Sequence, residues 1–141
     1  MREPPLVELE RAPVIRLLMS PSFFGSTAVR AVLDDDPQLV VVARGARNGR
    51  SLSEREWAVL KERIVGCRLE QMPYTAPQDV RPDVAWADGT TWLVEYFDGT
   101  HHVLVERWGI EHQTVERGLV AFRPLCMYML ELAGLSNAPN Y

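Results

Sequence analysis

The chain has 141 residues, of which 47% are hydrophobic and 24% charged, a composition that excludes a disordered segment and is typical of one folded domain. Its formal net charge of -4 opposes general attraction to nucleic acid and favours a partner protein with a basic surface. We expect a single domain over residues 1–141 and no nucleic acid partner.

The first residues carry prolines and charges where a signal peptide would have an apolar stretch, and we expect residues 1–12 to be irregular. No segment approaches the roughly 20 apolar residues that cross a bilayer. Cys67 and Cys126 have neither a metal-type spacing nor the density of a disulfide scaffold. The sequence therefore predicts a cytoplasmic protein with no membrane contact and two free thiols.

Three runs rich in β-branched residues, 14–19, 27–33 and 39–44, predict antiparallel strands because serine, proline and aspartate separate them. The following residues 45–51 are expected to form a loop before a helix. A helix start attracts anions, so Arg44, Arg47 and Arg50 are candidates for an anion site. The glycine spacing does not match a Walker loop, and the alternative is a solvated loop.

A helix is predicted over residues 53–65. Ser53 can accept from the Glu56 amide while the Glu56 carboxylate reaches back to Ser53, which is a capping box. Gly66 is the expected left-handed residue that ends this helix.

The dipeptide Asp98-Gly99 lies between two β-prone runs, 92–97 and 100–105, and predicts a two-residue hairpin turn. That register places Glu95 directly opposite His102. It also predicts a core face formed by Trp92, Val94, Tyr96, Val103 and Val105. A further short strand is expected at residues 84–86.

A second, largely apolar helix is predicted over residues 116–133 and ends at Gly134, with Leu135 returning to Leu130. Pro124 conflicts with an unbroken helix, so the regular helix alternatively begins there. The predicted fold is α+β, with a mostly antiparallel sheet of five or six strands packed against two helices.

Glu95 and His102 are the candidate catalytic residues, because a carboxylate can orient an imidazole that acts as a general base. Adjacent histidines on a strand point to opposite faces, so His101 and His102 cannot chelate one ion. The alternative is a structural cross-strand pair. We expect no metal and no cofactor, since no nucleophile, zinc or dinucleotide motif is present.

Four aromatic residues are candidates for binding a partner, because aromatic side chains are common interface anchors. The alternative is that they close the rim of the core. The four candidates are Phe23, Phe24, Trp86 and Trp108.

Five segments of the chain carry a resemblance: Trp92-Leu93-Val94-Glu95, Asp98-Gly99, His102-Val103, Glu106-Arg107-Trp108 and the run from Phe122 to Leu135. In these segments the chain resembles a group of small bacterial proteins of uncharacterised function. It implies an α+β fold in which the C-terminal helix packs on a hairpin, and it implies no activity.

These observations favour a non-enzymatic protein-binding domain. Its most specific form is a cytosolic immunity-type protein, or antitoxin, that neutralises a partner toxin by occlusion. Two alternatives remain: a small enzyme that uses His102 with Glu95 in a cleft, and a structural or accessory subunit that pairs through a sheet edge.

Overall fold

The computed structural model describes residues 12–21, 25–76, 89–112 and 114–135. The first half contains β1 (Val14–Pro21), β2 (Thr27–Val32), β3 (Gln38–Ala43), β4 (Ala46–Ser51), α1 (Glu54–Cys67) and the short 3-10 helix η2 (Leu69–Gln71). The second half contains β5 (Thr90–Phe97), β6 (His102–Trp108) and α2 (Phe122–Leu132). The strand predicted at residues 84–86 lies outside the described residues.

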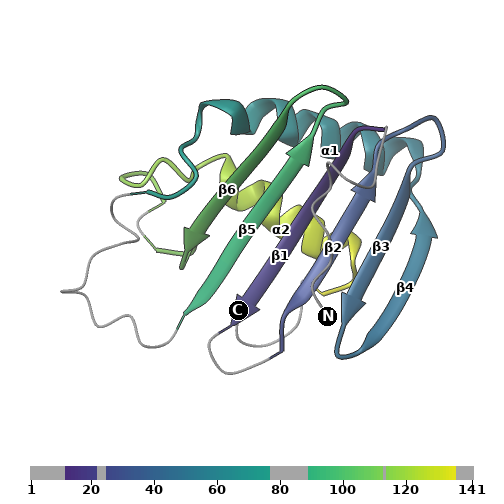
Figure 1. The fold of residues 1–141 in the computed structure, drawn as a ribbon, viewed down its shortest axis with the longest axis horizontal. Helices are drawn as coiled ribbons and strands as arrows, with labels where there is room; N and C mark the ends of the chain where they lie inside the picture. Colours follow the sequence, from purple (N-terminus) through teal and green to yellow (C-terminus); the bar gives the residue numbers. More distant parts are fainter. Residues whose placement is uncertain (1–11, 22–24, 77–88, 113, 136–141) are drawn as a thin grey trace.

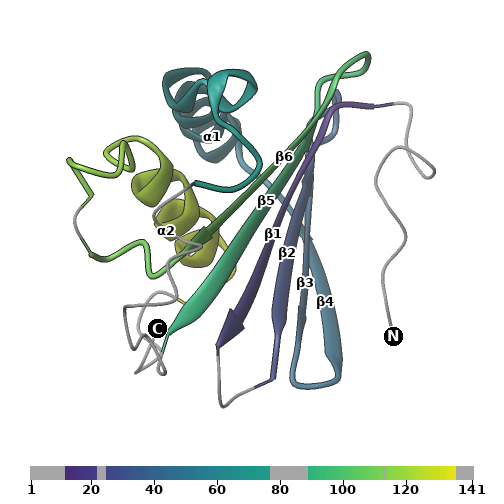
Figure 2. The same cartoon turned by 60° about the vertical axis from the view of Figure 1, so that its left-hand side comes forward.

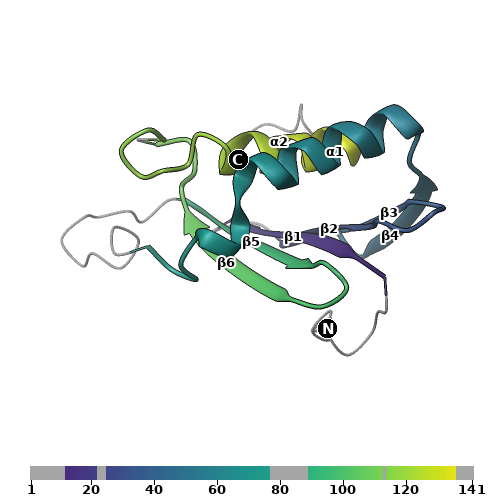
Figure 3. The same ribbon diagram turned by 90° about the horizontal axis from the view of Figure 1, so that it is seen from above.

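The six strands form one sheet in the order β4-β3-β2-β1-β5-β6, and all neighbouring strands are antiparallel (Figure 1). Both helices lie on the same side of this sheet (Figures 2 and 3). The predicted α+β fold is confirmed.

Alternation along the strands sends one set of apolar side chains toward the helices, where they meet buried residues of α1 and α2. Leu17 of β1, Leu60 of α1 and Leu125 of α2 are all fully buried in this layer. Burial of this apolar surface is the main stabilising contribution to the fold. The strands contribute Ile15, Leu17, Met19, Val29, Ala31, Leu39, Trp92, Val94 and Val105 to it.

Helix α1 begins as predicted. The Ser53 hydroxyl accepts from the Glu56 amide at 3.1 Å, and the Glu56 carboxylate accepts from the Ser53 amide at 2.9 Å. The prediction that Gly66 ends the helix is wrong, because the left-handed residue is Arg68, with φ 50°. Leu69, which is 1% exposed, anchors the chain immediately after this turn.

Helix α2 begins at Phe122, later than the predicted residue 116 and two residues before Pro124. Proline is tolerated there because the first turn of a helix has no partner for its amides. The end of α2 is as predicted: the Leu135 amide donates to Leu130 O at 2.8 Å and the Gly134 amide to Glu131 O at 3.0 Å.

Two hairpin turns differ from the prediction. A tight turn at Arg44 and Gly45, with φ 50° and 76°, connects β3 to β4, so residues 46–51 form a strand and not a loop. At the other hairpin, the Asp98 carboxylate accepts from the amides of Thr100 and His101, which extends the loop to residues 98–101. Phe97 therefore pairs with His102, two residues from the predicted register.

Candidate functional site

The sheet face that points away from α1 and α2, here called the outer face, carries the clearest candidate site. Its side chains form rows that cross all six strands, since each pairs with a neighbour on the adjacent strand. Several of its apolar members are partly exposed and lie outside the main core cluster. They are Leu18, Val32, Val40, Val42, Leu93, Phe97 and Leu104.

A charged cluster lies in the middle row of the outer face. Glu95 pairs with Arg16 on β1, and Arg16 pairs in turn with Arg30 on β2. Glu95 is only 3% exposed, although no described helix lies on this side of the sheet. Its Oε2 accepts from Arg16 Nη2, and its Oε1 lies 2.7 Å from His102 Nε2.

The predicted contact between Glu95 and His102 is present, although the predicted register is wrong. Glu95 pairs with Leu104, and His102 is its diagonal neighbour. A register error of two residues keeps every side chain on its original face, because side chains alternate with a period of two. The diagonal separation is within reach of a long side chain.

This geometry favours a structural role for the pair. Both oxygens of Glu95 are engaged, one by a guanidinium and one by an imidazole, so the carboxylate is satisfied where it is buried. The His102 side chain is 32% exposed, and its Nε2 contacts the Glu95 carboxylate. No group of three or more metal-ligating side chains occurs within the described ranges.

Arg16 is a site residue that the sequence analysis missed. It interrupts an otherwise apolar strand, and a guanidinium within such a strand is seldom buried unless it is paired. The Arg16 side chain is 13% exposed. This pattern indicates a buried ion pair. The sequence does not identify the partner of Arg16, because Glu95 lies 79 residues away.

The three anion-site candidates do not converge. Arg44 lies in the turn, while Arg47 and Arg50 pair with Val42 and Leu39 and so point to opposite faces of the sheet. Arg50 is already held by both oxygens of Glu56, at 2.9 and 3.0 Å, and it donates to Leu132 O at 2.8 Å. Arg50 therefore ties β4 to both helices.

Of the four aromatic candidates, only Trp108 is described; Phe23, Phe24 and Trp86 lie outside the described residues. Trp108 is partly buried at the end of β6, and its ring covers Gly89 so closely that a Cβ there would lie 2.0 Å from Cζ2. Its ring also stacks on His112, at 6.3 Å between centroids. These contacts give Trp108 a packing role at the rim of the sheet.

Both cysteines are poor nucleophiles. Burial raises the pKa of the Cys67 thiol to about 11 and places that of Cys126 well above its ordinary value. A thiolate is the reactive form, so neither residue provides a nucleophile near neutral pH.

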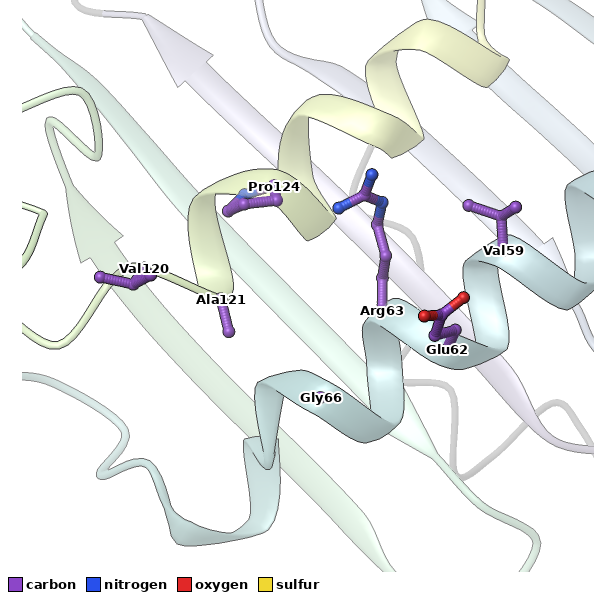
Figure 4. A pocket seen from close by; sticks show the side chains of 7 residues that line it. All are labelled: Val59, Glu62, Arg63, Gly66, Val120, Ala121 and Pro124. Atoms are coloured by element: carbon purple, nitrogen blue, oxygen red, sulfur yellow. The ribbon is translucent and has the colours of Figure 1, made fainter.

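Two hollows that the sequence did not predict lie on the helix side. One, of about 290 Å³, separates α1 from the start of α2, where Arg63 reaches across beside Val59 and Pro124 (Figure 4). The other, of about 240 Å³, lies between β3, β4 and the end of α2. His102 lines neither of them, which disfavours a catalytic cleft built on this imidazole in either place.

No family model matches the chain, and no curated protein matches it. No helix in the described part of the chain is long and apolar enough to span a membrane.

Proposed function

We propose that this protein is a non-enzymatic protein-binding domain and that its outer face contacts the partner. The observation that carries the proposal is that the rows on either side of the Arg16–Glu95 pair carry partly exposed apolar side chains, Phe97 and Val32 in one row and Leu93 and Leu18 in the other. The solvated face of an antiparallel sheet is normally polar, and a contiguous apolar patch usually marks an interaction site.

The arrangement of side chains also supports this proposal. A typical interface has apolar contact area together with a few satisfied polar groups that fix orientation. Leu18 and Leu93 pair across β1 and β5 and supply apolar area, while Arg16 and Glu95 supply a fixed charged pair beside them. The rigid sheet keeps these groups in place before binding, which reduces the entropic cost of association.

The most specific version of the proposal is a cytoplasmic immunity-type protein that occludes a toxin. The small size and the net charge of -4 support it, since an acidic protein suits a basic toxin. When the protein that binds the outer face is identified, we expect its gene to lie beside the gene of this protein. We also expect the purified protein to inhibit the toxic activity of that partner.

The test compares two variants that each place a lysine at an apolar position, one partly exposed and one exposed. Leu93→Lys alters the outer face, whereas Val65→Lys alters α1, where Val65 is 76% exposed. Each immobilised protein is used to capture partners from a lysate of the source organism, followed by mass spectrometry. We expect a wild-type partner to be retained by Val65→Lys and lost with Leu93→Lys.

Circular dichroism and a cooperative urea unfolding transition of both variants provide the folding control. The same partners captured by both variants would contradict the proposal.

A further inference from the structure

The two edges of the sheet differ in whether they are covered. At the β6 edge, the Glu106 amide donates to Tyr74 O at 2.7 Å, and the Arg107 guanidinium donates to Tyr74 O and Pro73 O. The β4 edge has no comparable cover among the described residues, and all six residues of β4 are exposed. An uncovered edge offers backbone groups for pairing with another strand.

The turn determines which backbone groups of β4 point outward. In a two-residue hairpin the residues that flank the turn, Ala43 and Ala46, form a hydrogen-bonded pair, and bonded and non-bonded pairs then alternate. Arg47 and Gly49 consequently belong to non-bonded pairs. Their N–H and C=O groups face away from β3, toward the uncovered edge.

Positive charge accumulates along this edge. Residues 44–51 contain three arginines and no acidic residue, although the whole chain has a net charge of -4. Arg50 is neutralised by Glu56. Arg44 and Arg47 have no acidic partner among the residues that the structure describes, so the edge favours an acidic ligand.

The hollow of about 240 Å³ adjoins the same edge on the helix side of the sheet. Leu39 and Val41 of β3 form part of its wall, and Leu132 and Leu135 close it at the end of α2. It is smaller than the ~300–1,000 Å³ typical of sites for drug-sized ligands, and its apolar walls suit a side chain of a peptide.

We propose that the β4 edge binds an extended acidic segment of a partner protein as an additional strand of the sheet. Backbone hydrogen bonds to Arg47 and Gly49 hold the segment, as in other cases of strand addition. An acidic side chain of the segment lies beside Arg47 on the outer face. The next side chain points to the helix side and enters the hollow, because successive residues of a strand alternate in direction.

A second copy of this protein is a poorer occupant of the edge. Its own residues 44–51, the turn and β4 together, would bring three further arginines and no acid to the junction. Like charges that face each other across a strand pair are destabilising. The inference does not depend on the outer face as the main binding surface, since its test alters β4 alone.

The test uses two synthetic hexapeptides, each capped and labelled with fluorescein: one alternates glutamate and valine, and the other alternates lysine and valine. Fluorescence polarisation measures their binding to the full chain. We expect the acidic peptide to bind at least about tenfold more tightly than the basic one, a difference of ~1.4 kcal/mol.

Two β4 variants and one control complete the design. Gly49→Pro removes an outward N–H without removing a bond to β3, and we expect it to abolish binding of the acidic peptide. Arg47→Glu should weaken binding about tenfold, whereas Arg123→Glu, the same charge change at an exposed position of α2, should leave it unchanged. Circular dichroism and urea unfolding verify that each variant is folded.

Three results would overturn the proposal: no binding of the acidic peptide to the wild-type protein, equal binding of both peptides, or unchanged binding by a folded Gly49→Pro variant. A fourth contradicting result would come from analytical ultracentrifugation. A wild-type dimer that Gly49→Pro dissociates would assign the edge to a second copy of the chain and contradict an acidic partner.

Discussion

The two faces of the sheet are built from the same strands but contain different chemistry. On β1, Leu17 points to the helices and is fully buried, whereas its neighbour Leu18 points to the outer face and is partly exposed. The helix side is almost entirely apolar, while the outer face places Arg16 and Glu95 between apolar side chains such as Phe97 and Leu93. We infer that the helix side provides the stability of the fold and that the outer face is available for recognition.

The largest expected effect on stability comes from truncating the two adjacent leucines, Leu17 and Leu18, which point to opposite faces of the sheet. Leu17→Ala leaves a cavity under both helices and should lower the free energy of unfolding by about 3 kcal/mol. Leu18→Ala removes the same atoms from a partly exposed position and should cost about 1 kcal/mol. Urea denaturation measures both, and equal losses would show that the two faces contribute equally to stability.

Glu95→Gln tests the buried charge on the outer face. The amide keeps the shape of the side chain but removes the negative charge that lies against the Arg16 guanidinium, so we expect a loss of about 2 kcal/mol in urea denaturation. Glu106→Gln on the same face is the control and should change the unfolding free energy by at most ~0.5 kcal/mol. If the Glu95→Gln variant is as stable as the Glu106→Gln control, the Arg16–Glu95 ion pair does not stabilise the fold.

Ser53→Ala measures how much the N-terminal cap of α1 contributes to the stability of the helix side. Loss of the Ser53 hydroxyl leaves the Glu56 amide without its acceptor and should cost about 1 kcal/mol. Chemical denaturation is the measurement. An unchanged midpoint would mean that this cap does not stabilise α1.

The smallest expected effect on stability is the pH-dependent contribution of the Glu56 carboxylate. The hydrogen bond from Arg50, followed by that from the Ser53 amide, lowers the pKa of Glu56 below its ordinary value of 4.5. Its ionised form therefore stabilises the fold above that value, and this contribution is lost as pH falls through the lower folded pKa. We expect the stability difference between wild type and Glu56→Gln to shrink in that acidic range, and a difference independent of pH would contradict the assignment.

Local signals in the sequence predicted the α1 capping box, the end of α2 and the apolar face of the β5–β6 hairpin correctly. Each depends on residues close together in the chain, such as Ser53 with Glu56. The alternation of side chains also predicts Glu95 and His102 on one face, since it is insensitive to a register shift of two residues.

The remaining features depend on tertiary contacts. Strand β4 has the sequence Ala-Arg-Asn-Gly-Arg-Ser, which has little β-propensity, and its extended form follows from pairing with β3. The hairpin register was missed because the Asp98 carboxylate accepts from two amides and lengthens the loop. Arg16 and Glu95 meet only because β1 and β5 are neighbours in the sheet.

Hydroxyl-radical footprinting of the protein, alone and with the captured partner, tests the role of the outer face most directly. Leu18 and Leu93 should be oxidised in the free protein and protected in the complex, while Leu17, which is fully buried, should be unreactive in both. Equal oxidation of Leu18 and Leu93 with and without the partner would contradict binding through the outer face.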